Sequence, residues 1–279
     1  MSVPARPPAP EPLPRPVVDS HCHLDIARDE GAAPIPVERA VAEAAAVGVD
    51  RLVQIGCDLA GARWAVEVAA AHAAVVAGVA LHPTEATRHA DEGSLDGALA
   101  EVAELAARPD VRAVGETGLD HYWVGPEGRQ AQEESFRAHI ALARELGKAL
   151  VIHDRDAHAD VLRVLADAGP PDTVVFHCFS GDAAMARYCA EQGWYVSFAG
   201  PVTFRNAAGL REALTQVPPA QVLVETDSPY LTPHPYRGRP NGPYLLPYTV
   251  RAVAEVLGRD LAETCDTVTA NAVRVFGPW

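Results

Sequence analysis

The sequence predicts a single (β/α)₈ barrel of the TIM type, and two observations support this fold class. Eight short apolar runs recur along the chain, and most are followed by an amphipathic segment rich in Ala, Leu, Glu and Arg. Strands and helices that alternate at this spacing form parallel strands joined by crossover connections. Eight such units over about 260 residues match a barrel. The strand-like runs are 16–20, 52–56, 75–80, 111–115, 149–152, 173–176, 195–198 and 222–225.

The elements follow one another in the order that a barrel needs. An amphipathic helix is predicted after the first run, and the Ala-rich stretch 64–81 divides into a helix and the third strand. Two helices at the C-terminal end would close the barrel. The main alternative, a doubly wound open sheet, should carry a glycine-rich phosphate turn after its first strand. Here the first run ends in His-Cys-His instead. The clearest helices are 37–47, 129–146, 157–168, 247–257 and 261–276.

The first sixteen residues differ in composition from the rest of the chain. They hold seven prolines and predict a disordered tail, residues 1–16, before a barrel domain at 17–279. No charged-then-apolar leader opens the chain, and no apolar stretch reads as a membrane span. The five cysteines are odd in number and include no C-x-x-C pair. We therefore expect a reduced, cytoplasmic setting without contact to a membrane.

The charged residues limit the possible chemistry. A net charge of −14 argues against strong electrostatic attraction between the chain and nucleic acid. A phosphate ester stays possible as a substrate, because bound cations supply local positive charge. Lys148 is the only lysine and precedes the fifth strand, so it should lie at the opposite end from that strand's C-terminal residues. A catalytic or metal-bridging lysine is therefore improbable, and any bridge between two metals falls to a carboxylate.

Six metal-binding side chains occur at the C-terminal ends of the predicted strands 1, 4, 5, 6 and 8. Active sites of (β/α)₈ barrels lie at that end of the strands. In an extended segment, two histidines separated by one residue project to the same side. The six side chains could hold two cations at one rim. They are His21, His23, Glu116, His153, His177 and Asp227.

Two cations about 3.5–4 Å apart can activate a water molecule and stabilise a displacement at phosphorus or at a carbonyl carbon. Imidazole suits zinc and other transition metals, whereas carboxylates also suit Mg²⁺ and Mn²⁺. The mixed ligand set therefore leaves Mg²⁺, Mn²⁺ and Zn²⁺ open. Asp227 is the only acid after strand 8 that is placed to act on the water, since Glu225 lies two residues deeper in the strand.

Six motifs, in order, resemble those of the TatD family of metal-dependent deoxyribonucleases, which belongs to the amidohydrolase superfamily. The motifs are VDSHCHLD, GETGLD, VIHDRDA, HCFSG, YVSFAGPVTFRNA and VETDSPYL. The resemblance runs from about Val18 to Phe276 and implies a hydrolase of ester bonds that cleaves DNA, as a 3′–5′ exonuclease. It implies that one metal is bound by His21, His23, Glu116 and Asp227, and the second by Glu116, His153 and His177. It also implies catalytic roles for Asp227, which would orient or deprotonate the attacking water, and for the bridging Glu116.

Four further residues are candidates for substrate contacts. His82 follows strand 3, and we interpret it as a substrate contact or a neighbour of the ligands rather than as a seventh ligand. Arg155 suits phosphate, but an ion pair with Asp156 or Asp120 is slightly favoured. Two further arginines could also bind phosphate, because the planar guanidinium group can donate two hydrogen bonds to phosphate oxygens. At both positions a purely structural role, as an anchor of the loop, is an equal alternative. The two arginines are Arg205 and Arg237.

Two other functions compete with the nuclease. A metal-dependent amidohydrolase or deacylase, acting for example on aminoacyl-tRNA, would share the barrel and the metals. A metal-stabilised binding protein without turnover is the third possibility, but structural sites usually close their coordination sphere. The expected partner is DNA or another phosphoester, and no obligate protein partner is evident. His139, on a predicted helix, is interpreted as non-functional.

Overall fold

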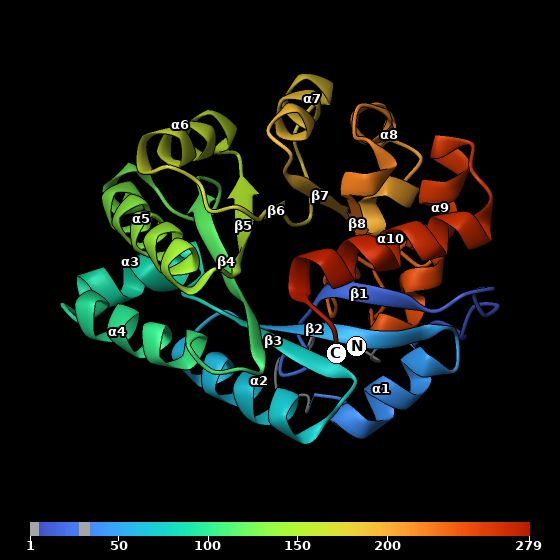
Figure 1. Ribbon diagram of the computed structural model, residues 1–279, viewed down its shortest axis with the longest axis horizontal. Helices are drawn as coiled ribbons and strands as arrows, with labels where there is room; N and C mark the ends of the chain where they lie inside the picture. The colour runs from blue at the N-terminus through green and yellow to red at the C-terminus, as the bar shows by residue number, and fades with distance from the viewer. Residues whose placement is uncertain (1–5, 28–33) are drawn as a thin grey trace. The chain divides into compact units, whose positions relative to one another are not determined.

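The structure is a computed structural model that describes residues 6–27 and 34–279. Within these residues, parallel strands follow one another in the order β1 to β8 and alternate with helices (Figure 1). This order confirms the predicted (β/α)₈ barrel class. The strands are β1 (Val17–Cys22), β2 (Val49–Gly56), β3 (Val75–Val79), β4 (Val111–Asp120), β5 (Ala149–Arg155), β6 (Val174–Phe176), β7 (Tyr195–Phe198) and β8 (Val222–Val224).

Several helices begin or end at residues that suit helix termini. The side chain of Asp58 accepts a hydrogen bond from the backbone N–H of Gly61 and caps α2, and Gly147 ends α5 with a φ of +60°. The helices are α1 (Val37–Ala45), α2 (Leu59–Ala71), α3 (Pro83–Asp91), α4 (Leu95–Ala106), α5 (Arg129–Leu146), α6 (His158–Ala168), α7 (Ala183–Glu191), α8 (Ala208–Thr215), α9 (Leu246–Leu257) and α10 (Leu261–Phe276).

The chain divides into two compact units. The first comprises the chain up to residue 54 together with 181–279. In it the first strand lies beside the last, because Cys22 and Ser228 form a parallel bridge just beyond β8. Helix α10 packs against both β1 and β8 (Figure 1). Pairing of the first strand with the last is expected of a barrel and not of an open doubly wound sheet, so the alternative fold is excluded.

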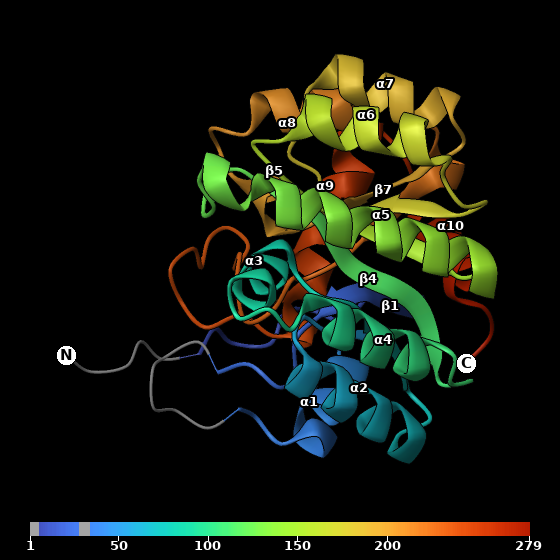
Figure 2. The same cartoon turned by 90° about the vertical axis from the view of Figure 1, so that its left-hand side faces the viewer.

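The second unit, residues 55–180, is built around β4, which pairs with β3 and β5. Helices α3, α4 and α5 lie along β4 (Figure 2). Both β4 and β5 extend beyond the predicted runs, so Glu116 and His153 lie within strands rather than after them. Gly118 pairs with His153 at a φ of +141°, and a Cβ at this position would collide with the carbonyl oxygen of His153. Glycine is therefore required where the two strands meet.

The proline-rich segment differs from its prediction. The backbone N–H of Leu13 donates to the carbonyl of Val47 at 3.0 Å, and the Tyr244 hydroxyl donates to the carbonyl of Pro7 at 2.8 Å. The Leu13 side chain is buried. Disorder is therefore wrong for residues 6–16, and the start of the predicted tail lies outside the described residues. Proline reduces the conformational freedom that the unfolded segment loses, so a proline-rich segment can pack with little secondary structure.

None of the helices in the described part of the chain combines the length and the apolar character that crossing a bilayer requires.

Candidate metal centre

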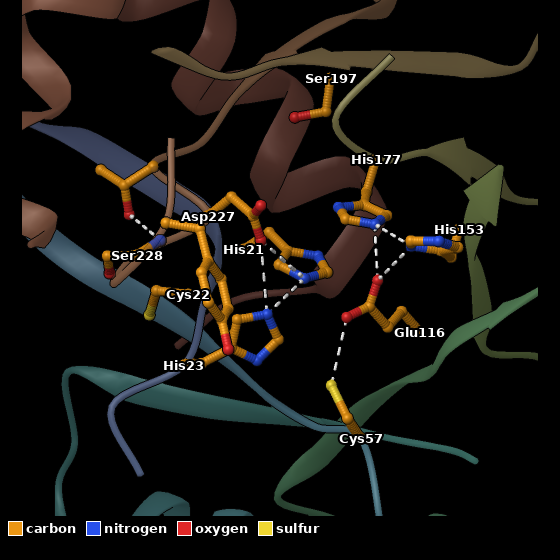
Figure 3. Close-up of polar contacts among 12 residues, drawn as sticks. His21, Cys22, His23, Cys57, Glu116, His153, His177, Ser197, Asp227 and Ser228 are labelled. Carbon is orange, nitrogen blue, oxygen red and sulfur yellow. Dashed lines mark hydrogen bonds and ion pairs between the residues drawn. The ribbon is translucent and has the colours of Figure 1, made fainter. Parts of the chain in front are cut away.

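The first unit brings together three of the predicted ligands, from the end of β1 and the residues after β8. The Nε2 atoms of His21 and His23 are 3.3 Å apart, and Oδ1 of Asp227 lies 3.8 Å and 3.4 Å from them, respectively (Figure 3). All three side chains are buried. As predicted, the two histidines lie on one side of an extended segment.

Backbone and side-chain hydrogen bonds hold this cluster together. The backbone N–H of Asp227 donates to the carbonyl of His21 at 2.9 Å, which fixes Asp227 in a left-handed conformation with a φ of +51°. Asp19 accepts hydrogen bonds from the backbone N–H and the hydroxyl of Thr226 and so ties β1 to the segment after β8. The side-chain amide of Asn241 donates to the carbonyl of Thr226 at 2.9 Å. The loop that carries Asp227 is therefore fixed from two sides.

The second unit brings together the other three predicted ligands, from β4, β5 and the end of β6. Oε2 of Glu116 lies 2.6 Å from Nε2 of His177 and 3.2 Å from Nδ1 of His153, and these two nitrogens are 3.4 Å apart (Figure 3). The Cys57 thiol donates to the other carboxylate oxygen, Oε1, at 3.1 Å. Glu116 and His177 are buried, whereas His153 is partly exposed.

The spacing of both clusters fits divalent cations. Two donors about 2.0–2.1 Å from one tetrahedral ion stand about 3.4 Å apart. The separations among His21, His23 and Asp227 run from 3.3 to 3.8 Å, close to that value. In the second cluster two separations fit, and the 2.6 Å contact is a hydrogen bond that has to lengthen when an ion binds. Each cluster supplies nitrogen and carboxylate donors, a set that Zn²⁺ and Mn²⁺ accept.

Asp120, at the end of β4, contacts a ligand from outside the cluster. Its Oδ2 lies 3.0 Å from Nε2 of His153, the ring nitrogen opposite the one that faces Glu116. Gln132 holds the Asp120 backbone through two hydrogen bonds of 3.1 Å. A carboxylate on the far nitrogen of a metal-binding histidine fixes its tautomer and its ring orientation. Asp120 is therefore a positioning residue for His153.

Burial and charge set the protonation of the groups around the ligands. Burial opposes charge on His153, but hydrogen bonds to Asp120 and Glu116 outweigh it and raise the pKa of this histidine. Burial is the largest single effect on Asp120 and works against its ionised form, but hydrogen bonds from His153 and from the backbone of Trp123 and Tyr122 together outweigh it and lower its pKa. The two shifts agree and favour a charged pair in the metal-free protein. A cation at Nδ1 of His153 requires that nitrogen to be deprotonated, so metal binding should release protons.

His82 lies beside the second cluster. Its ring packs edge-on against the ring of His153, with 4.4 Å between centroids, and its Nδ1 caps α3 by accepting from the backbone N–H of Thr84 at 3.2 Å. Burial lowers the pKa of His82 to about 4. The side chain is therefore neutral near pH 7, and its capping role orients it next to a ligand.

The three arginines predicted to contact substrate are all exposed. Arg155 does not form the ion pair with Asp156 or Asp120 that was slightly favoured, because its guanidinium stacks on the ring of Tyr122, 4.0 Å from the centroid. Asp120 is engaged elsewhere, as described above. Arg237 stacks on the ring of Phe204, with a distance of 4.6 Å to the centroid.

The sequence analysis gives no role in the site to Asp19, Cys57 or Asn241, and considers Asp120 only as an ion-pair partner of Arg155. A signal existed for the first. Asp19 precedes His21 by two positions, so the period of a strand places it on the same side as the histidines. Asp120 belongs to the GETGLD motif, but the predicted strand ends at residue 115, so the sequence gives no reason to place Asp120 beside a histidine of the next strand. Asn241 lies far along the chain from the segment that it holds, and no local pattern reveals such a contact.

The whole chain is similar to known metal-dependent hydrolases. The family model described as TatD related DNase matches residues 18–277. The chain is 50% identical over 267 residues to an uncharacterized metal-dependent hydrolase, TatD, of Mycobacterium tuberculosis, covering 94% of this chain and 98% of that protein. It is 38% identical over 261 residues to the uncharacterized metal-dependent hydrolase YcfH of Escherichia coli K12, with 93% and 95% coverage.

A solved structure shares the fold. The crystal structure of YJJV, a TatD homolog from Escherichia coli K12, superposes with a TM-score of 0.84 over 94% of this chain and 98% of that chain, at 24% identity. The family model and the curated relatives match the chain over nearly its full length, and the solved structure shares its fold. The chain belongs to the TatD-related DNase family and is a metal-dependent hydrolase.

Proposed function

We propose that the chain hydrolyses phosphodiester bonds of DNA and acts as a 3′–5′ exonuclease that needs two divalent cations. Membership of a family whose model is described as a DNase supports the substrate class. The observation that carries the proposal is the pair of three-residue clusters, each with the donor types and the spacing of a cation site.

The two clusters are proposed to form one binuclear centre. In a (β/α)₈ barrel the C-terminal ends of all strands gather at one rim, and every ligand comes from such an end. We assign His21, His23 and Asp227 to one cation and His153 and His177 to the other. Glu116 would bridge them, since the only lysine of the chain lies at the start of β5.

The residues around the cations divide the work. When bound, two divalent cations supply an activated water and neutralise charge that develops on the phosphoryl oxygens. Asp227 is proposed to orient this water and accept its proton, because it is the most exposed ligand of its cluster and its backbone is held by His21. Asp120 keeps His153 in one tautomer. The cations also offset the net charge of −14, which would otherwise repel a polyanion.

The test compares the rates at which the protein hydrolyses different types of bond in the presence of different divalent cations. Single- and double-stranded DNA, labelled at the 5′ or the 3′ end, is incubated beside carboxyl esters, amides and aminoacyl-tRNA with Mg²⁺, Mn²⁺ or Zn²⁺. We expect the label of 3′-labelled DNA to be released first as mononucleotides. EDTA should abolish hydrolysis, and an added cation should restore it.

Two results would contradict the proposal. Faster turnover of an amide, an ester or aminoacyl-tRNA than of DNA would identify the chain as an amidohydrolase or deacylase. Full activity in metal-stripped protein would rule out the mechanism for any of these substrates.

A further inference from the structure

Two large aromatic side chains are exposed next to each other after the end of β4. Tyr122 is 56% and Trp123 is 66% exposed. Their rings stand edge to face, with centroids 4.9 Å apart and an interplanar angle of 88°. The two rings together form one contiguous exposed apolar patch, the kind of surface feature that can mark a binding site.

Arg155, at the end of β5, completes this surface. Its guanidinium carbon lies 4.0 Å from the ring centroid of Tyr122 and 5.5 Å from that of Trp123. Within the described residues its charge is not paired with a carboxylate, which leaves it available to an anion. We call Tyr122, Trp123 and Arg155 the aromatic platform.

The aromatic platform is connected to the metal ligands through one carboxylate. Oδ1 of Asp120 accepts hydrogen bonds from the backbone N–H groups of Tyr122 at 2.9 Å and Trp123 at 2.7 Å. The other oxygen of the same carboxylate holds Nε2 of His153 at 3.0 Å. In the sheet Asp120 pairs with Arg155. The platform and His153 are therefore fixed to the same two strand ends and to the same side chain.

We propose that the aromatic platform stacks an unpaired nucleobase of the substrate strand and thereby positions the adjacent phosphodiester at the cations; this inference rests on the proposed function. Every base has a π-face, so aromatic rings bind single strands with little regard to sequence. The guanidinium adds a charge that a backbone phosphate can meet. A chain with a net charge of −14 has little general attraction for nucleic acid, so stacking has to supply much of the binding.

The first experiment measures binding without catalysis. With the divalent cation bound, a short oligothymidylate with non-hydrolysable phosphorothioate linkages is titrated into the protein while tryptophan fluorescence is recorded, and the anisotropy of a labelled strand gives the Kd. We expect the strand to quench the fluorescence, because Trp123 stacks on a base. Trp123→Ala and Tyr122→Ala should each raise the Kd about ten-fold, and Trp123→Phe should restore most of the affinity.

The second experiment separates binding from chemistry. With a divalent cation present, Trp123→Ala should raise KM about ten-fold while kcat falls far less, and the effect should shrink for a strand whose terminal nucleotide is abasic. Arg155→Met should raise KM as well. The matched control is Arg108→Met, which removes the same charge from an exposed position before the start of β4 and should leave KM unchanged.

The outcomes keep the two proposals apart. If DNA is hydrolysed and neither aromatic variant changes Kd or KM, the platform is wrong and the nuclease stands. Strand-dependent quenching that is lost in Trp123→Ala supports the platform even if no DNA is cleaved, in which case the proposed nuclease is wrong. Equal effects of Arg155→Met and Arg108→Met would show that only overall charge matters and would overturn the role of Arg155.

Discussion

At the scale of single residues, two buried carboxylates on β4 have different tasks. Glu116 faces His153 and His177 and is itself a proposed ligand, whereas Asp120 holds the far nitrogen of His153 and the backbone of the next residues. Removing the charge of Glu116 should weaken metal binding directly, whereas removing the charge of Asp120 should disturb the orientation of His153. The two substitutions therefore distinguish a residue that binds metal from one that positions a ligand.

Glu116→Gln keeps the size of the side chain but removes the charge that the two proposed cations would share. We expect loss of one metal ion per chain and a fall in turnover by several orders of magnitude, since the two-metal arrangement would be gone. Metal analysis of the purified variant and DNA hydrolysis measure both effects. His72→Gln, at the end of α2, serves as the control. Two retained metals with near-normal hydrolysis would disprove the bridging role.

Asp120→Asn preserves the shape of the side chain but weakens its hold on the imidazole of His153. Carboxylates in this position typically contribute 10- to 100-fold, so we expect metal affinity or activity to fall by roughly that factor. Competition with a chromogenic chelator measures the affinity. Metal affinity equal to that of the unaltered protein would show that Asp120 serves the aromatic platform alone.

At the scale of elements, α5 is attached to the strands through a histidine that the sequence presented as unimportant. His139 is fully buried, its Nε2 accepts from the backbone N–H of Leu81 at 3.2 Å, and its Nδ1 lies 2.7 Å from the carbonyl of Ser135. A polar residue on a helix reads as a surface residue unless the packing partner is known. His139 is therefore a structural residue and an unsuitable control for activity.

His139 should also make stability depend on pH. Burial lowers its pKa to about 4, from an ordinary value of 6.5. The unfolded chain thus binds this proton more readily, so the stability is complete above pH 6.5 and decreases as the pH falls toward 4. Between about pH 7 and pH 5 the loss amounts to roughly 2 kcal/mol.

Urea denaturation across this pH range tests the histidine. His139→Gln removes the titrating group, so its free energy of unfolding should fall less steeply between neutral and acidic pH than that of the unaltered protein. The comparison concerns slopes and is independent of any general destabilisation. An unchanged slope in His139→Gln would refute the assignment.

At the scale of the whole molecule, the eight strands, the barrel class and the bounds of several helices followed from the sequence, since apolar periodicity and strand–helix alternation are local signals. Helix 129–146, for example, was predicted at both ends. The lengths of β4 and β5 were not, because Glu116 to Asp120 is polar and glycine-containing and is held extended by its neighbouring strand. The contact of Asn241 with Thr226 depends on the finished fold.

The packed proline-rich segment predicts a contribution to stability that a disordered tail would not make. Leu13 is 8% exposed and lies against Gly48, whose added Cβ would stand 3.2 Å from that of Leu13. Leu13→Ala should lower the free energy of unfolding by about 2 kcal/mol. Thermal or urea denaturation measures it, with the exposed Glu11→Ala as the control. Equal free energies of unfolding for the two variants would show that the proline-rich segment does not contribute to stability.

The single lysine has a practical consequence. Its Nζ donates to the backbone carbonyls of Ala106 and Arg108, which precede β4, and burial lowers the pKa of Lys148. Amine-reactive dyes or surfaces therefore have one internal point of attachment, at the end of β4 remote from Glu116. With the N-terminal amine blocked, enzyme tethered through Lys148 should present the strand ends that carry the proposed ligands to the solution in one orientation, which makes the chain suited to immobilisation and to single-molecule measurements.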